Sequence, residues 1–466
     1  MVRGSKDFTR FSLGREVQQQ LGNSQQTHGS VTKKLITEDN INVALHKAKG
    51  SGARIVSWTV KNFTAKGDNY VSVVTSVDIK YQLDGNEYST SFIAKLGAPQ
   101  STKTFSESID YAFVKECRVY EEIVPLLGEE LISRGLQRLR VPECYYAICE
   151  PGDQVIYLED LRIRGFQTRE RKAPLDKAHT TLVLQEMARL HAASLLLQSR
   201  GGYEQLDVKF PYLNKDCFDV TEDVQKMAAG LLDKHMQETI IALKEFEGYQ
   251  KAIQWLTDLM PHAYETWMRQ LDNNTKFAVI CHGDCWNNNI LFRYDDQGNP
   301  IEAMLVDLQL LRFASLAADI QLLFCISLTG HERKSNLDYY LDVYYESFKS
   351  VMDSGGLAMP FTRGELADEY ESKRLYGLFW AMAFLPAILS ESEDIPDEFY
   401  TNDLLTASEG LSSCSASQDP DGESVGSPMS EKEKEVFLLK FKKNPDLTSR
   451  FLSLFDDIIG NGENVL

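Results

Sequence analysis

The order of hydrophobic patterns along the chain is the feature that most restricts its fold. Between Arg54 and Leu96, β-branched and aromatic residues form candidate strands, and Asp84-Gly85 is a hairpin turn signal. Residues 105–127 have helical spacing, and two further strands are predicted within 142–158. After Leu161 the apolar spacing is mainly helical, and the predicted helices include 248–271 and 364–390. This order predicts an α+β fold, in which a small antiparallel-sheet lobe precedes a larger, mainly helical lobe.

Shifts in composition along the 466 residues indicate where segments begin and end. The first residues are polar and Gln-rich, and a later stretch is rich in Ser, Asp, Glu, Gly and Pro. We therefore expect five parts: a flexible N-terminal extension at 1–36, an N-terminal lobe at 37–160, a C-terminal lobe at 161–394, a disordered acidic Ser-rich insertion at 395–433 and C-terminal helices at 434–466.

The formal net charge of −19 argues against two classes of partner. Nucleic-acid binders and membrane-surface proteins need clustered Lys and Arg to neutralise phosphate groups. The apolar run at 377–389 is short of the roughly 20 residues that cross a bilayer. The N-terminus has no apolar signal sequence, and no Cys-x-x-Cys pair occurs. We therefore expect a cytoplasmic protein that binds neither nucleic acid nor membrane and shows no obligate protein partner.

One loop carries residues that suit phosphoryl transfer. A short apolar strand at 279–281 leads into a polar loop with the pattern His-x-Asp-x-x-x-x-Asn, which ends at Asn289 before another apolar strand. Phosphoryl transfer needs a carboxylate that orients the attacking hydroxyl, and oxygen ligands that hold Mg²⁺ on the ATP phosphates. Asp284 is predicted to be the catalytic base, with Asn289 and Asp307 as the metal ligands. Cys281 and Cys285 bracket His282 and Asp284, but we interpret them as buried packing residues, not metal ligands.

The N-terminal half supplies candidate groups for binding ATP phosphates. Lys95 ends an apolar strand, and Glu116 follows on the next predicted helix, so we expect the two to pair and to position the phosphates. Gly67, Asn69 and Ser72 lie between the first two strands, where a turn would cover the phosphates. A hairpin turn and a solvated strand Lys are the plainer interpretations of these residues.

The remaining candidates concern the adenine, the loop and the acceptor. Glu159 and Leu161 stand where a hinge between the lobes would bind an adenine edge. His191 is expected to pack within a helix, and Asp319 to anchor the catalytic loop. Aromatic residues of the helical half could line an acceptor pocket, although ordinary core packing suits their spacing better: Trp255, Trp267, Trp380, Tyr339 and Phe384.

Together these motifs resemble the ecdysteroid kinase-like family, also called CHK kinase-like proteins. The family's H-G-D-x-W-x-N-N signature is matched by 282–289, and its Asp-Phe-Gln motif by 307–309, with Leu308 in place of Phe. Its glycine turn, its Glu-Asp-Leu hinge and its Ala-Arg-x-His-Ala helix match 67–72, 159–161 and 188–192. The resemblance implies a two-lobed protein-kinase-like fold related to aminoglycoside phosphotransferases and choline kinases. It also implies ATP- and Mg²⁺-dependent phosphorylation of a small-molecule hydroxyl, on an ecdysteroid or another steroid or xenobiotic.

Two alternatives stay open. A choline or ethanolamine kinase would suit an acidic chain, but Gln309 stands where such kinases tend to place an acid. A non-catalytic binding protein with a kinase fold would be expected to lack at least one of the reacting residues. Lys95, Asp284, Asn289 and Asp307 are all present.

Overall fold

The computed structural model describes six stretches of the chain: residues 35–62, 72–97, 103–150, 153–203, 205–389 and 431–460. The chain forms two compact units, each described by itself: one contains residues 1–98 and 143–160, the other 99–142 and 161–466. Residues 99–142, assigned above to the N-terminal lobe, thus group with the larger unit. Most of the predicted N-terminal extension and acidic insertion, 1–34 and 395–430, lies outside the described residues.

The first unit is a five-stranded antiparallel sheet with one helix. The strand order is β1-β2-β3-β5-β4, with bounds Arg54–Asn62, Ser72–Leu83, Asn86–Gly97, Cys144–Ile148 and Val155–Glu159 for β1 to β5. Asp84 and Gly85 have φ values of 51° and 80°, which confirms the predicted tight turn between β2 and β3. Helix α2 (Glu38–Lys49) begins after Thr37, whose side chain accepts a hydrogen bond from Asn40. Its apolar face packs on the sheet and forms the core of this unit.

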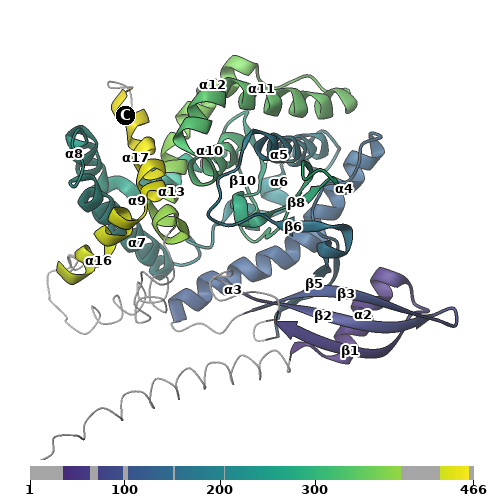
Figure 1. Ribbon diagram of the computed structural model, residues 1–466. Helices are drawn as coiled ribbons and strands as arrows, with labels where there is room; N and C mark the ends of the chain where they lie inside the picture. The colour runs from purple at the N-terminus through teal and green to yellow at the C-terminus, as the bar shows by residue number, and fades with distance from the viewer. Residues whose placement is uncertain are drawn as a thin grey trace, which may run out of the picture. The chain divides into compact units, whose positions relative to one another are not determined.

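The second unit is mainly helical (Figure 1). Its α-helices are α3 (Lys103–Arg118), α4 (Val124–Ser133), α5 (Lys177–Gln198), α6 (Leu206–Lys209), α7 (Glu222–Leu243), α8 (Gln250–Leu259), α9 (Ala263–Gln270), α10 (Leu316–Ser327), α11 (Gly330–Ser354), α12 (Arg363–Ser372), α13 (Arg374–Leu389), α16 (Glu431–Lys443) and α17 (Pro445–Gly460). A π-helical turn, η1 (Val119–Ile123), joins α3 to α4, and Pro125 follows it at the start of α4.

Two small antiparallel sheets complete the second unit. Strands β7 (Ala278–Cys281) and β10 (Arg312–Ser315) form one pair. Strands β6 (Phe166–Thr168), β8 (Ile290–Tyr294) and β9 (Pro300–Leu305) form the other sheet, in the order β6-β8-β9. Strand β10 leads directly into α10, which is buried along its whole length, and the loop that leaves β7 is hydrogen-bonded to Asp319 of this helix.

These elements confirm the predicted α+β class, with a small antiparallel-sheet unit and a larger, mainly helical one. Among the described residues, no helix is both long enough and apolar enough to pass through a bilayer.

Candidate functional site

The predicted catalytic carboxylate lies in the loop between β7 and β8. Strand β7 is buried throughout, and a single 3-10 turn, η5 (Asn287–Asn289), precedes β8. Gly283 has a φ of 79°, and a Cβ atom at this position would lie 2.1 Å from the carbonyl oxygen of Leu310. The left-handed backbone and the close approach therefore both require glycine here. This tight turn directly precedes Asp284.

Asp319, in the first turn of α10, holds the backbone of the loop. Its carboxylate accepts hydrogen bonds from the backbone N–H groups of His282 (2.6 Å) and Gly283 (2.9 Å), and it contacts Nε2 of His191 at 3.1 Å. The other ring nitrogen of His191 contacts the Tyr344 hydroxyl at 2.7 Å. Burial alone would raise the pKa of Asp319, but the bonds from His191 and the loop lower this pKa below its ordinary value. Asp319 thus has the anchoring role expected of it.

His282 links this loop to the strand that precedes Asp307. Its Nε2 lies 3.1 Å from the carbonyl oxygen of Val306, and its Nδ1 accepts a bond from the Asp284 N–H at 3.3 Å. Complete burial lowers the pKa of His282, so the ring is neutral. A neutral ring that donates from Nε2 and accepts at Nδ1 satisfies both contacts. His282 is therefore a structural tie, not a reacting group.

Asp284 and Asn289 contact each other directly. The Nδ2 group of Asn289 donates to Oδ2 of Asp284 at 2.7 Å and to the Asp284 backbone oxygen at 2.9 Å. Asn289 is buried, whereas Asp284 is partly exposed. The hydrogen-bonded Nδ2 group of Asn289 fixes the rotamer of Asp284. The amide oxygen of Asn289 is left to point away from Asp284. The loop thus presents a carboxylate and an amide oxygen with defined orientations.

Asp307 adopts a backbone conformation that only glycine, Asn and Asp visit readily. Its φ is 65°, a left-handed conformation that is sparsely populated outside glycine and persists where neighbouring contacts hold it. The N–H of Val306 donates to the backbone oxygen of Asn289 at 3.0 Å. On the other side, the N–H of Leu308 donates to Oε1 of Glu116 at 3.2 Å. Asp307 is thus held from both flanks, and strain of this kind is typical of functional sites.

Glu116 therefore has a role within the second unit that the sequence did not reveal. Its side chain is fully buried on α3 and accepts the bond from Leu308, which is 192 positions away in the sequence. The predicted partner, Lys95, lies in the first unit at the centre of the sheet, with Val74 and Ile156 opposite it on β2 and β5. Lys95 is 5% exposed. The pairing of Lys95 with Glu116 stays a prediction.

The remaining predicted nucleotide-binding residues fall on the first unit and its border. Ser72 begins β2 and lies opposite Gly97. Glu159 ends β5, and its N–H donates to the backbone oxygen of Glu143 at 2.8 Å. Leu161 is where the chain re-enters the second unit, and it is buried. Gly67 and Asn69 lie outside the described residues.

A second cluster could in principle hold a metal ion. His191, Cys281 and Asp319 bring one ligand atom each to within 4.8 Å of the others. However, both ring nitrogens of His191 are engaged, and the Cys281 thiol is 3.4 Å from the backbone oxygens of Ala314 and Ser315. Burial raises the pKa of the Cys281 thiol, which opposes the thiolate that a metal would need. We therefore interpret this cluster as the support of the loop.

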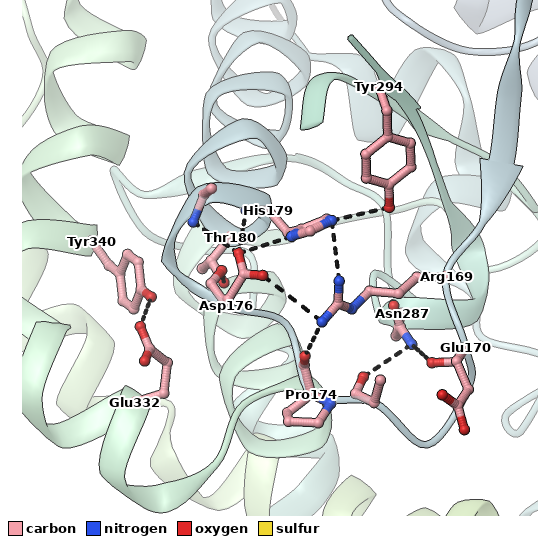
Figure 2. A network of polar contacts seen from close by, with 12 residues as sticks. Arg169, Glu170, Pro174, Asp176, His179, Thr180, Asn287, Tyr294, Glu332 and Tyr340 are labelled. Carbon is pink, nitrogen blue, oxygen red and sulfur yellow. Dashed lines mark hydrogen bonds and ion pairs between the residues drawn. The ribbon is translucent and has the colours of Figure 1, made fainter. Parts of the chain in front are cut away.

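Asn287 is a functional candidate that the sequence did not single out. Its backbone N–H donates to the Ser327 hydroxyl at 3.1 Å, and its Nδ2 donates to the Glu170 oxygen at 2.9 Å. Figure 2 shows this amide directed at the backbone that carries Glu170. The only sequence signal was the run of three Asn residues, whose separate roles depend on contacts far away in the chain.

A polar network fixes the backbone that Asn287 contacts. Arg169 donates to the Pro174 oxygen at 3.1 Å and lies 3.2 Å from Nε2 of His179 (Figure 2). His179 in turn contacts Oδ1 of Asp176 at 2.8 Å and the Tyr294 hydroxyl at 3.0 Å. This network joins the start of α5 to β8. The loop between β7 and β8 (282–289), which we call the reacting loop because of its predicted role, is therefore supported on its far side as well as by Asp319.

Comparison with known proteins gives a family match over most of the chain. A model of the ecdysteroid kinase-like family matches residues 66–356. A Caenorhabditis elegans protein named "uncharacterized kinase-like protein D1044.1" is 31% identical over 94 residues, which are 20% of this chain and 23% of that protein. The chain thus spans about a quarter of the length of this curated relative.

Three solved structures with a detectable likeness are two kinases and a phosphotransferase. Plasmodium vivax ethanolamine kinase is 14% identical, with 78% of this chain and 86% of that chain covered and a TM-score of 0.38. The choline kinase LicA from Streptococcus pneumoniae is 12% identical, with coverages of 81% and 99% and a TM-score of 0.31. A GDP complex of aminoglycoside 2'-phosphotransferase-IIIa is 11% identical, with coverages of 80% and 98% and a TM-score of 0.36.

Proposed function

The chain belongs to the ecdysteroid kinase-like family of small-molecule phosphotransferases, and from this premise we propose that it transfers the γ-phosphoryl group of ATP to a hydroxyl of a small molecule in a Mg²⁺-dependent reaction. The observation that carries this proposal is the bond between Asn289 and Asp284. It orients a partly exposed carboxylate at the tip of a loop whose backbone is fixed by buried groups.

In this proposal Asp284 orients the acceptor hydroxyl and accepts its proton as the O–P bond forms. General-base assistance of this kind contributes about 10²–10⁴-fold in rate. The bond from Asn289 stabilises the ionised carboxylate and selects one rotamer, so the base is positioned before the acceptor arrives. The proton moves from the acceptor oxygen to a carboxylate oxygen of Asp284, and ADP is the leaving group.

The oxygen donors of the site suit Mg²⁺. Asn289 uses its nitrogen to bind Asp284, so its oxygen is the atom that could face a metal, and Asp307 supplies a carboxylate. Mg²⁺ prefers such oxygen ligands. Held by Asn289 and Asp307, the ion would supply positive charge that neutralises the phosphate groups. We assign the phosphate contacts to Lys95, with Glu116 as its predicted partner, and to Gly67, Asn69 and Ser72, which were predicted to form a turn. The adenine edge is assigned to Glu159 and Leu161.

An aromatic cluster that begins in the reacting loop marks the side on which we place the acceptor. The ring centroids of Trp286 and Phe384 are 6.4 Å apart, those of Phe384 and Trp380 5.1 Å, and those of Trp380 and Trp267 6.2 Å. Trp267 is 8% exposed, and its indole N–H has no hydrogen-bond acceptor among the described residues. Aromatic rings gathered in this way favour a ligand that itself carries apolar rings.

The five aromatic residues predicted for an acceptor pocket separate into two groups. Trp267 and Trp380 belong to the large hydrophobic core of the second unit, and Phe384 and Trp255 pack against that core. Tyr339 instead lies on α11, where it is 40% exposed and the ammonium group of Lys177 stacks on its ring. We therefore leave Tyr339 out of the proposed acceptor side.

An ADP-release screen tests the proposed function. Wild-type protein with Mg²⁺-ATP is offered an ecdysteroid, choline, ethanolamine, an aminoglycoside and a glycoside. We expect an apolar ring-bearing alcohol to stimulate ADP release, and Asp284→Asn to lower that turnover by at least about 100-fold. Asp296→Asn, which changes an exposed aspartate in the β8–β9 turn, is the matched control.

Other outcomes decide between the alternatives. Stimulation by choline or ethanolamine alone would favour a kinase for cationic alcohols. A wild-type protein that binds no Mg²⁺-ATP in calorimetry would be a non-catalytic member of the family, and the proposal would be wrong. Turnover that is unchanged in Asp284→Asn would remove Asp284 from its assigned role.

A further inference from the structure

One face of α3 is bound to the backbone of another segment. Ser108, Tyr111 and Lys115 are separated by three and four positions, so their side chains lie on the same side of the helix. All three donate to backbone oxygens of residues 212–218, which we call the clamp segment. The bonds run from Ser108 Oγ to Cys217 (2.7 Å), from Tyr111 Oη to Tyr212 (3.3 Å) and from Lys115 Nζ to Lys215 (2.8 Å).

Lys115 is costly to bury, which suggests that its contacts matter. It is 2% exposed, and a charged amine in such a place is retained only where charges and acceptors compensate it. Burial lowers the pKa of Lys115 to about 8, while the charge of Asp216 raises it. A hydrocarbon side chain of the same length would fill the space without this penalty. The presence of the ammonium group is therefore better explained by a role in positioning α3 than by a contribution to the stability of the protein.

The clamp segment is joined in turn to the strand that leads into the reacting loop. Asp216 and Arg312 form a buried ion pair, each with about 5% of its side chain exposed. Arg312 lies on β10 directly opposite Cys281, the residue before His282. A buried pair of this kind is a weak source of stability, but the loss of one partner is strongly disruptive.

The same segment also reaches the aromatic cluster. The ring of Phe218 lies with its centroid 5.7 Å from that of Trp267 and 6.1 Å from that of Trp380. The clamp segment thus has three attachments within the second unit: α3 on one side, β10 through Asp216, and the proposed acceptor side through Phe218.

Glu116 follows Lys115 directly and accepts the bond from the N–H of Leu308. Any rotation or sliding of α3 therefore moves the carboxylate that holds the turn at Asp307. We propose that Lys115 and Asp216 are positioning residues, which seat α3 on the clamp segment so that Glu116 holds the Asp307 turn, and which couple the acceptor side to the metal carboxylate. The functional part of this inference, the coupling to the metal carboxylate, rests on the proposed phosphotransferase activity. The mechanical part, the seating of α3 on the clamp segment, does not.

Amide hydrogen exchange on the full chain tests the mechanical part. Lys115→Met should raise the exchange rate of the Leu308 amide by at least about tenfold, while amides of α5 and α11 keep their wild-type protection. Lys226→Met, at an exposed position of α7, is the matched control and should change nothing. Unchanged exchange at Leu308 in a folded Lys115→Met protein would overturn the proposal. So would an equal rise in every helix, because that pattern indicates general destabilisation.

A second pair of variants separates the bond to Leu308 from other roles of Glu116. Glu116→Gln keeps an oxygen that can accept from the Leu308 N–H, so protection should be retained; Glu116→Ala should lose it. If Lys115→Met fails to fold, Ser108→Ala and Tyr111→Phe remove single clamp bonds and should each raise Leu308 exchange by a smaller factor. No rise in either would contradict the clamp.

Calorimetry with Mg²⁺-ATP tests the functional part. Substitution of residues that orient metal ligands typically lowers metal affinity by 10–100-fold. Lys115→Met and Asp216→Asn should therefore weaken the binding of Mg²⁺-ATP by about tenfold. Faster Leu308 exchange with unchanged affinity would show that the clamp does not serve the metal carboxylate. If the wild type binds no Mg²⁺-ATP, the proposed function fails, and the exchange data still decide whether the clamp exists.

Discussion

The side-chain amide of Asn289 donates to the carboxylate of Asp284 at 2.7 Å, so the proposed metal ligand and the proposed base orient each other. This relationship predicts different losses for the two residues. Asn289→Ala removes the proposed metal ligand and the bond that orients the proposed base, so it should weaken Mg²⁺-ATP binding by 10–100-fold and also reduce turnover. Asp284→Asn should leave nucleotide affinity near the wild-type value. Titration calorimetry of both variants makes the comparison.

The control for Asn289→Ala is Gln297→Ala, which removes an exposed side-chain amide in the neighbouring turn. It should bind Mg²⁺-ATP like the wild type. Equal affinities for Asn289→Ala and the wild type would take Asn289 out of the metal site, whatever the effect on turnover.

The positive φ of Asp307 predicts a stability order that ordinary substitution rules would not give. Glycine and asparagine tolerate a φ of 65°, whereas alanine is strained there by about 1–2 kcal/mol. Asp307→Gly and Asp307→Asn should therefore unfold in urea at higher concentrations than Asp307→Ala. All three should bind Mg²⁺-ATP more weakly than the wild type, because each removes the carboxylate. If Asp307→Ala proves the most stable of the three, the strain at this position is not real.

Gly283 combines a positive φ with a close approach, and the two effects can be separated. In Gly283→Ala the new Cβ atom would meet the Leu310 oxygen at 2.1 Å, so backbone must move. We expect this variant to lose about 3 kcal/mol of unfolding free energy from strain and overpacking together. Gly298→Ala has a similar φ of 84° but nothing within 4 Å, so only about 1 kcal/mol should be lost. Chemical denaturation of both variants measures the difference, and equal losses would contradict the crowding at Gly283.

Local patterns in the sequence single out Asp284, Asn289 and Asp307 as candidates because the information they use lies within short segments. An apolar strand, a polar loop and a second apolar strand place these residues at strand ends, where side chains are displayed. The bond between Asn289 and Asp284 spans only five positions. The sheet of the first unit could be predicted equally well, because its hairpin depends on the local preference of Asp84-Gly85 for positive φ.

Contacts between distant segments could not be predicted in the same way. Glu116 was assigned to Lys95, yet within the described residues it also holds Leu308, 192 positions away. Short β10 was missed because its four residues pair only with β7. The helix predicted at 248–271 is broken by a 3-10 turn at Met260–His262, where Pro261 interrupts the hydrogen-bond ladder. The helix predicted at 364–390 breaks near Lys373 without any proline or glycine, so that break depends on tertiary packing.

The buried amine of Lys115 predicts an unusual dependence of stability on pH. The groups that face it are Asp216, Arg312, the Cys217 thiol and the backbone oxygen of Lys215. Its pKa is about 8 in the native protein, against 10.5 for an ordinary lysine. Between these two values the unfolded chain binds more protons than the native one, so the contribution of Lys115 to stability rises with pH. Below pH 8 the cost of the buried charge is fully present and constant.

As the pH is raised from 8 to 10.5, the unfolding free energy of the wild type should therefore increase relative to that of Lys115→Met. A pKa difference of this size corresponds to a relative gain of about 3 kcal/mol. Because other groups titrate in the same range, the measured quantity is the difference between the two proteins in urea unfolding at each pH. Lys226→Met removes an exposed lysine and should show no such gain over the interval. Parallel curves for the wild type and Lys115→Met would mean that the Lys115 amine is as well solvated in the native protein as in the unfolded chain.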